Sequence, residues 1–118
     1  MRAFITGSQL YGKPTPKSDI DLVVMVDYGD LCLLKSKADK IVEDSQGSAG
    51  GPGSASMMFG KLNLLATTEE DAFAVWKLGT TKCINKARKK GLKPITRKEA
   101  VAIFSKMRRI YLGEKEDQ

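Results

Sequence analysis

The amino-acid sequence predicts a single α+β domain of two layers, in which a small mixed sheet of three strands packs with about three helices. Short apolar runs alternate with longer segments whose apolar residues recur every three or four positions. A length of 118 residues is usual for one domain, and 42% hydrophobic with 29% charged residues is ordinary for a folded one. We therefore expect one domain over residues 1–112 and a disordered tail over residues 113–118.

The first two strands are predicted near the N-terminus. Residues 2–6 form a short apolar run that stops at Gly7, and residues 8–11 can then make one helical turn. After a loop with two prolines, residues 19–26 begin with alternating polar and apolar residues and end as a continuous apolar run. This pattern indicates a strand that emerges from a buried sheet, with two aspartates at its start.

The middle of the chain is predicted to hold a helix, a loop and the third strand. Residues 30–43 place apolar side chains at helical spacing, and Asp30 can cap the first turn. Residues 45–56 are rich in Gly, Ser and Pro, so we expect a mobile loop within the domain. Residues 57–66 then form the third strand, in which Gly60 can make a bulge.

Two helices are predicted in the C-terminal part. Thr68 is expected to cap the first of them, whose opening turn is acidic and which ends near Gly91. Thr96 and Glu99 have the spacing of a capping box, and apolar residues at helical spacing follow them. The last helix therefore begins at this capping box.

The net charge of +6 is unevenly distributed along the chain. Residues 72–110 hold twelve Lys or Arg and one acidic residue, Glu99. Such clustering favours a polyanion partner, because cations release counterions from phosphates; the alternative is a pair of solvated helix faces. No apolar run approaches the roughly 20 residues that span a bilayer, so we expect no membrane partner and a cytoplasmic location.

The chain contains no histidine. This absence excludes the Ser-His and Cys-His nucleophile pairs and the zinc sites that use histidine ligands. Any catalysis must depend on carboxylates, hydroxyl groups or a metal ion.

A Gly-Ser pair and a pair of aspartates stand at a characteristic spacing in the first 25 residues. Gly7-Ser8 lies at a turn from strand to helix, Gly12 follows, and the second strand opens with Ser18-Asp19-Ile20-Asp21. This pattern resembles the nucleotidyltransferases of the DNA polymerase beta superfamily, and the chain is similar in size to their minimal members. The resemblance implies a nucleotidyltransferase-like fold that binds a nucleoside triphosphate such as ATP together with Mg²⁺ or Mn²⁺.

The resemblance implies that Gly7, Ser8, Gly12 and Ser18 bind the nucleotide. Without a Cβ, Gly7 lets the backbone approach a phosphate closely. Ser8 offers a hydroxyl and an N–H group at the positive end of a helix, where anions bind well. Ser18 is expected to cap the turn before the aspartates rather than to act as a nucleophile, because no base is apparent beside it.

Asp19 and Asp21 are implied to be the catalytic and metal-ligating residues. They lie two apart on a strand, so both carboxylates share one face and can ligate Mg²⁺. Two metal ions held there would align an attacking hydroxyl with the α-phosphate and neutralise the charge of the departing pyrophosphate.

The third strand departs from the family pattern. The family usually places a further carboxylate there, which completes the metal site and accepts the proton of the attacking hydroxyl, and here Asn63 stands at the corresponding position. An Asn oxygen can ligate Mg²⁺ weakly, so Asn63 is a candidate third ligand. It adds no negative charge and cannot act as a base at neutral pH, which puts catalysis in question.

Three functions remain open from the sequence. The first is metal-dependent nucleotidyl transfer from a nucleoside triphosphate to an unidentified hydroxyl acceptor on RNA, DNA or a partner protein. The second is a non-catalytic module of the same fold that binds nucleotide or a polyanion, and Asn63 favours it. The third is a nucleic-acid-binding accessory domain that depends on the basic C-terminal half and not on Asp19 or Asp21. The oligomeric state is also open.

Overall fold

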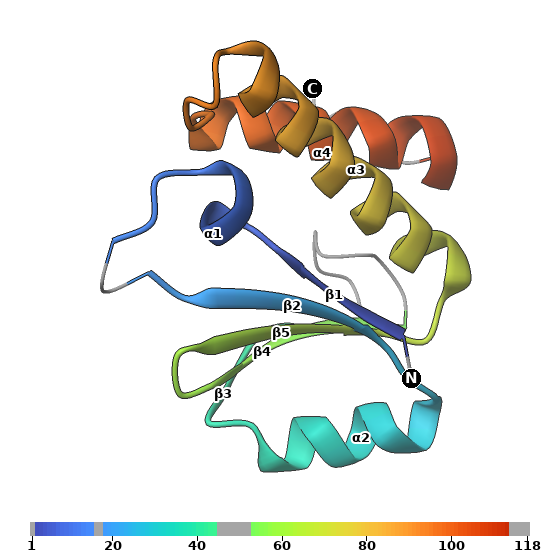
Figure 1. Ribbon diagram of the computed structural model, residues 1–118. Coiled ribbons are helices and arrows are strands. Elements are labelled where there is room, and N and C mark those ends of the chain that lie inside the picture. The colour runs from blue at the N-terminus through green and yellow to red at the C-terminus, as the bar shows by residue number, and fades with distance from the viewer. Residues whose placement is uncertain (1, 16–17, 45–52, 114–118) are drawn as a thin grey trace.

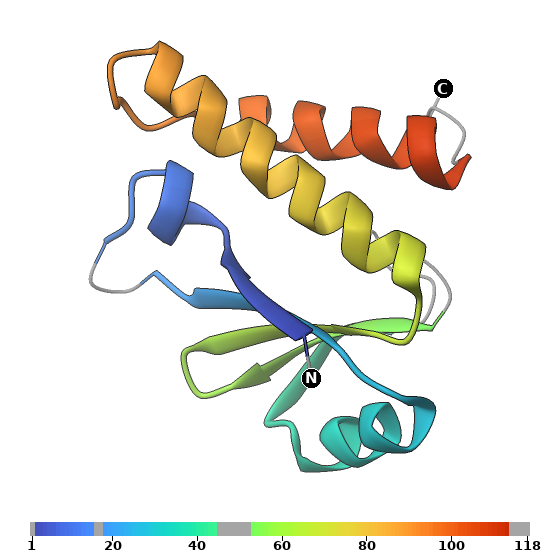
Figure 2. The same ribbon diagram turned by 45° about the vertical axis from the view of Figure 1, so that its right-hand side comes forward.

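A mixed sheet of five strands lies between helices on both of its faces (Figure 1). The computed structural model describes residues 2–15, 18–44 and 53–113. The elements, in chain order, are β1 (Arg2–Thr6), α1 (Ser8–Tyr11), β2 (Ile20–Met25), α2 (Tyr28–Lys37), β3 (Lys40–Asp44), β4 (Ser54–Phe59), β5 (Leu62–Thr67), α3 (Glu70–Lys89) and α4 (Arg97–Leu112). One face carries α2, and the other carries α1, α3 and α4 (Figures 1 and 2).

In the strand order β1-β2-β5-β4-β3, the strand β2 lies between β1 and β5. β2 and β5 run parallel, whereas the other neighbouring strands run antiparallel. In this register Thr6 on β1 lies opposite Asp21 on β2, and Asp21 lies opposite Asn63 on β5. Directly opposed residues share a face of the sheet, so these three side chains point to the same side.

The sheet has five strands rather than the predicted three, and one reason lies in residues 30–43, where we expected a single helix. The helix α2 ends at Lys37, and β3 occupies the rest of the segment as an edge strand paired with β4. Ile41 and Val42 are β-branched and favour a strand once a partner lies beside them. Apolar spacing within the segment does not reveal that partner.

The second reason is a hairpin where we expected one strand over residues 57–66. β4 and β5 pair antiparallel, and the chain reverses at Gly60 and Lys61. Gly60 has a φ of 61°, so it makes the turn rather than the bulge that the sequence suggested. A turn this short cannot be recognised from hydrophobic patterning when apolar residues continue on both sides of it.

β4 also extends into residues 45–56, which we expected to be a loop. Residues 45–52 lie outside the described part of the chain, but Ser54 and Ser56 are buried in β4. Their hydroxyl groups donate hydrogen bonds of 2.8 and 3.0 Å to side-chain oxygens of β5. Serine is therefore accommodated on an inner strand, because its polar atom is paired across the hairpin.

Two of the predicted helix caps are displaced. Asp27, not Asp30, caps α2: its Oδ1 accepts the backbone N–H of Asp30 at 2.7 Å. Glu69, not Thr68, is the N-cap residue of α3. The Thr68 hydroxyl instead donates to a backbone carbonyl just before β4, so it fastens the start of the hairpin rather than the helix.

The described part of the chain ends where α4 ends. Gly113 has a φ of 68° and closes α4 in the left-handed conformation. Residues 114–118, predicted to be disordered, lie outside the described part. Among the helices that the structure describes, none combines the length and the hydropathy that crossing a membrane requires.

The core lies on both faces of the sheet. On the α2 face, buried residues of β2, β4 and β5, with Val26 just after β2, pack against Leu31: the strand residues are Val24, Ala55, Met57, Leu64 and Ala66. On the opposite face, Val23 and Leu65 pack against Phe73 of α3. The sheet is therefore covered on both faces, and at one end of it Asp21 and Asn63 line a cavity that residues of α4 also line.

A glycine sets the close approach of the last two helices. A Cβ at Gly79 would lie 2.5 Å from the ring of Phe104, so the ring of α4 packs directly on the backbone of α3. Trp76, one turn earlier on α3, lies 4.7 Å from the Phe104 ring, measured between ring centroids. These contacts hold α4 against α3, with the start of α4 above α1 (Figure 1).

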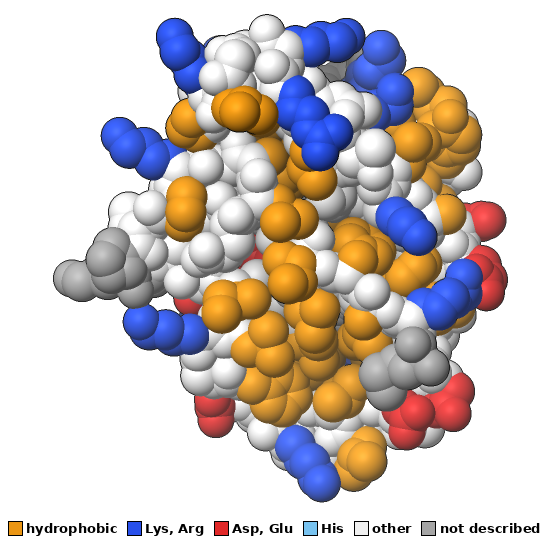
Figure 3. Space-filling view, in the orientation of Figure 1, with side chains coloured by type: hydrophobic (Ala, Val, Ile, Leu, Met, Phe, Trp, Pro, Cys, Tyr) orange, Lys and Arg blue, Asp and Glu red, His pale blue; other side chains and the backbone are white. Residues whose placement is uncertain are grey.

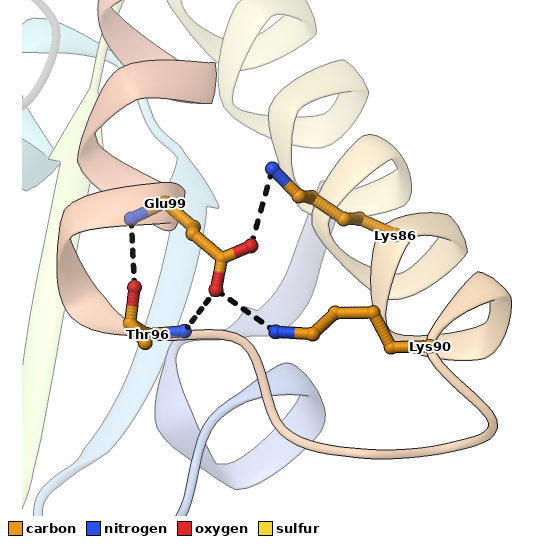
Figure 4. A network of polar contacts seen from close by, with 4 residues as sticks. All are labelled: Lys86, Lys90, Thr96 and Glu99. Carbon is orange, nitrogen blue, oxygen red and sulfur yellow. Dashed lines mark hydrogen bonds and ion pairs between the residues drawn. The ribbon is translucent and has the colours of Figure 1, made fainter.

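Glu99 ties the end of α3 to the start of α4 (Figure 4). It forms the predicted capping box: Thr96 Oγ1 accepts the N–H of Glu99 at 3.1 Å, and Glu99 Oε1 accepts the N–H of Thr96 at 3.0 Å. Lys90 and Lys86 approach the same carboxylate at 3.0 and 3.2 Å. The backbone hydrogen bond from Thr96 and then the two lysines lower the pKa of Glu99 to about 2.

We expect Glu99→Gln to lower the urea midpoint of unfolding at neutral pH and to flatten the acid dependence of stability. A carboxyl whose pKa falls from 4.5 to about 2 on folding adds stability above pH 4.5, and that stability is lost as the pH falls toward about 2. Urea unfolding at neutral pH and near pH 3 measures both effects. The exposed Glu69→Gln is the control; an equal response from the two variants would contradict the network.

Candidate functional site

The turn between β1 and α1 forms a cradle of backbone. Gly7 has a φ of 85° and a ψ of −165°, a conformation that is essentially confined to glycine. A Cβ at this position would lie 1.9 Å from Oδ2 of Asp21 and 2.8 Å from its Cγ. Gly7 therefore lets the Asp21 carboxylate rest directly against the backbone of the turn that carries Ser8.

Asp21 is a half-buried carboxylate with an amide on one side. The pKa of Asp21 lies above its ordinary value. Burial raises it most, the hydrogen bond from Asn63 lowers it by less, and the nearby charge of Asp19 raises it further. A partly desolvated carboxylate beside a second one gains from a bound cation, because the cation relieves both burial and repulsion.

Asn63 holds Asp21 with its nitrogen. Its Nδ2 donates to Asp21 Oδ1 at 3.0 Å, while its Oδ1 accepts the hydroxyl of Ser56 at 3.0 Å. The oxygen that would ligate a metal is thus engaged by Ser56, and the amide hydrogens face the carboxylate. In this arrangement Asn63 orients the Asp21 carboxylate through its nitrogen, and its role as a weak third metal ligand stays a prediction.

Asp19 and Ser18 lie on the approach to β2 rather than in the cradle. Asp19 is exposed, yet close enough to Asp21 for its charge to affect that carboxyl. Ser18 Oγ accepts the backbone N–H of Thr15 at 2.8 Å, which is the turn-capping role predicted for it. Asp19 can join Asp21 at a cation, whereas the Ser18 hydroxyl is already used by the turn.

A cavity of about 610 Å³ joins the cradle to the last two helices. Its first wall includes the predicted residues Gly7, Ser8, Gly12, Asp21 and Asn63, with Lys13 beside them. Its second wall comes from α3, α4 and the chain between them, and includes Trp76, Ile95, Thr96, Arg97, Ala100, Val101 and Phe104. Five of the seven predicted site residues thus line one cavity, and Asp19 and Ser18 do not.

The second wall was not anticipated from the sequence. Trp76 and Phe104 belong to apolar stripes at helical spacing, a pattern that indicates a buried helix face, and Thr96 was expected only to cap a helix. A long-range hydrogen bond, from the N–H of Ile95 to the carbonyl of Tyr11 at 2.9 Å, fastens the chain between α3 and α4 onto α1. A sequence signal for this wall is Arg97, a cation in the first turn of a helix, where cations are unfavourable.

Buried hydroxyl groups support the cradle from below. Burial raises the pKa of Tyr11 to about 12, so its hydroxyl stays protonated while it is hydrogen-bonded to the side chain of Thr6. Thr6 Oγ1 lies 2.6 Å from Thr80 Oγ1, and Thr80 donates to the carbonyl of Trp76 at 2.8 Å. This chain of hydrogen bonds connects the floor of the cradle to α3 and keeps the two walls in fixed relation.

The charged groups of the cavity suit an anion bound through a cation. Asp21 in the cavity wall, with Asp19 close to it but outside the wall, offers hard carboxylate oxygens, the donors that Mg²⁺ and Mn²⁺ prefer, and Lys13 and Arg97 of the wall supply positive charge. Among residues 2–15, 18–44 and 53–113, no group of three or more His, Cys, Asp or Glu is placed to hold a metal ion. Comparisons with protein-family models, with curated proteins and with solved structures found no match to this chain.

Proposed function

We propose that this protein is a metal-dependent nucleotidyltransferase, which moves a nucleoside monophosphate from a nucleoside triphosphate to a hydroxyl group of an acceptor. The observation that carries the proposal is the cavity itself. It combines a glycine cradle, a half-buried carboxylate and an apolar wall in one space of about 610 Å³, within the range of about 300–1,000 Å³ that small-molecule sites occupy.

The phosphates would lie against the first wall. The backbone at Gly7 is open to close approach, and Ser8 adds a hydroxyl and an N–H group. Lys13 and Arg97 line the same cavity and are exposed enough to reach a triphosphate. These groups oppose the negative charge that a nucleotide brings to the two aspartates.

Asp19 and Asp21 would hold the metal ion together with the phosphates. Mg²⁺ commonly binds through one or two carboxylates plus substrate phosphates, which fits a site with two carboxylates and no complete cage. When bound, the ion would neutralise charge on the phosphates and help to align the attacking hydroxyl. Asn63 contributes by fixing the Asp21 carboxylate in one orientation.

The nucleoside would lie against the second wall. Trp76, Val101 and Phe104 give this side an apolar surface next to the polar cradle. These three side chains would contact the base by packing, which discriminates weakly between bases.

A second candidate function is binding without transfer, and the geometry of Asn63 favours it. The position opposite Asp21 on β5 holds an amide whose nitrogen faces the carboxylate, so this position supplies neither a third negative charge nor a base. The same cavity would then serve as a nucleotide-responsive or polyanion-binding module. The two functions share a ligand and differ in whether pyrophosphate is released.

Calorimetric titration with ATP, GTP, CTP and UTP in Mg²⁺ tests the shared site, with pyrophosphate measured in the same samples. We expect binding that chelation of Mg²⁺ removes and that Asp19→Asn or Asp21→Asn weakens by more than about tenfold, since even the outer partners of metal ligands are worth that much. Asp30→Asn, on the opposite face of the sheet, is the matched control.

The outcomes separate the two candidates. Metal-dependent binding with pyrophosphate release supports transfer, and metal-dependent binding without release in the presence of candidate acceptors supports the binding module. Binding that survives Asp21→Asn, or no binding of any nucleotide, would contradict the proposed site.

A further inference from the structure

Cations gather where α3 ends and α4 begins. Arg88, Lys89, Lys93, Arg97 and Lys98 are all exposed and fall within eleven residues of chain; we name them the α3–α4 basic surface. In the space-filling view, Lys and Arg side chains stand along the upper part of the molecule, where Figure 1 has α3 and α4 (Figure 3). Glu99 is the one acidic residue between residues 72 and 113.

Interactions within the protein account for only part of this charge. Glu99 is already bound by Lys86 and Lys90, which are not members of the surface. Arg88 and Lys89 lie in the last turn of α3, where cations stabilise the negative end of the helix. Arg97 and Lys98 lie in the first turn of α4, where the helix end is positive and a cation is unfavourable. The helix end therefore does not stabilise these two cations, which leaves their charge open to an external anion.

The surface is continuous with the candidate site. Arg97 belongs both to the α3–α4 basic surface and to the second wall of the cavity. The hydrogen bond from Ile95 to Tyr11 fastens the chain between the two helices onto the cradle. Lys13, on the loop that follows the cradle, adds a cation to the first wall. An extended polyanion on this surface would therefore have one end at the mouth of the cavity.

We propose that the acceptor is a nucleic-acid strand whose phosphates lie on the α3–α4 basic surface and whose terminal hydroxyl enters the cavity; this rests on the proposed function. The hydroxyl oxygen forms a bond to the α-phosphorus, and the bond from that phosphorus to the oxygen bridging to the β-phosphate breaks. Pyrophosphate leaves with the bonding electrons, and the hydroxyl proton passes to water. The five residues of the surface include no aromatic side chain, so binding follows the phosphates rather than the bases.

Binding of a labelled single-stranded 15-nucleotide RNA, and of the same sequence as DNA, tests the surface without nucleotide present. We expect affinity that falls steeply with salt, and an affinity loss of about tenfold in Lys89→Gln/Lys93→Gln. The slope of log affinity against log salt should become shallower by about 1.4, because each phosphate contact to a single strand contributes about 0.7. Lys37→Gln/Lys40→Gln, around the turn from α2 to β3, removes the same charge elsewhere as the control.

A separate experiment measures where the end of the nucleic-acid strand lies. Trp76 is the one tryptophan of the chain and lines the cavity, so its fluorescence reports on the site. A dansyl group at a strand end should quench Trp76 more strongly than the same group in the middle of the strand. Equal quenching from both positions would overturn the placement of the terminal hydroxyl.

Failure of this inference is distinguishable from failure of the proposed function. If the protein binds nucleoside triphosphate but neither oligonucleotide, or if both lysine pairs matter equally, the nucleic-acid acceptor is overturned and the nucleotide site stands. If label from the triphosphate is found on a protein rather than on the strand, the acceptor is overturned in the same way. If no triphosphate binds, the proposed function fails and the acceptor role fails with it.

Discussion

Asn63→Asp is expected to raise Mg²⁺-dependent pyrophosphate release by about 10²-fold or more, since a well-placed general base contributes about 10²–10⁴-fold. The new carboxylate would stand opposite Asp21 on the neighbouring parallel strand, where the amide nitrogen now lies 3.0 Å from the Asp21 oxygen. It would add both a third negative charge for the metal ion and a proton acceptor. Release of pyrophosphate with each nucleotide, with and without an oligonucleotide, measures the effect.

The same substitution has a second signature that does not depend on turnover. Without metal, two carboxylates would face each other where a hydrogen bond now joins Asn63 to Asp21, so the melting temperature should fall at neutral pH. Mg²⁺ or Mn²⁺ should restore it, by more than either ion stabilises the unchanged protein.

Asn63→Ala is the control, because it removes the hydrogen bond without adding charge. It should also lower the melting temperature, but with no recovery beyond that of the unchanged protein when the metal ion is added. If Asn63→Asp and Asn63→Ala respond alike to the metal, the position opposite Asp21 does not face a cation and the proposed metal site is wrong.

The cradle could be predicted from the sequence because its geometry is local. A glycine at the end of an apolar run, followed by residues that can form a helical turn, indicates a strand-to-helix turn at Gly7. Asp21 could be placed because it begins a strongly apolar strand. The opposition of Asp21 and Asn63 is a long-range pairing across 42 residues, and the expectation that Asn63 occupies this position came from the resemblance rather than from periodicity.

The number of strands could not be predicted from spacing alone. Ile41 and Val42 fit a helical pattern as well as a strand, and only the presence of β4 beside them decides between the two. Ser54 and Ser56 look like loop residues until their hydroxyl groups are seen to pair with β5. In both places a tertiary partner, which is distant in sequence, outweighs the local propensity.

The second wall of the cavity was missed for a related reason. Apolar residues at helical spacing show that a helix face is buried, but not which part of that face borders a cavity. The close contact between Gly79 and Phe104 sets the crossing of α3 and α4, and this crossing leaves Val101 and Arg97 beside the cradle. The stripe that Phe104 belongs to is thus core at one edge and site at the other.

Gly7→Ala is expected to lower the free energy of unfolding by about 1–3 kcal/mol and to weaken nucleotide binding by more than about tenfold. Two effects add: the backbone conformation at Gly7 is nearly exclusive to glycine, and the new methyl group would occupy the place of Asp21 Oδ2, which lies 1.9 Å from the Cβ position. Moving that carboxylate would disturb the cation site. Urea unfolding and calorimetric titration measure the two effects separately.

Gly91→Ala isolates the backbone effect, because Gly91 has a φ of 77° and a Cβ there would meet no atom within 4 Å. It should cost stability and leave nucleotide binding unchanged. Asp21→Ala isolates the steric effect: with the carboxylate removed, Gly7→Ala should cost less stability than it does alone, and the difference measures the coupling of the two residues. If Gly7→Ala costs the same in both backgrounds, the cradle does not hold the Asp21 carboxylate. If it costs less but binding is unaffected in the single variant, the carboxylate rests against the cradle without serving the nucleotide.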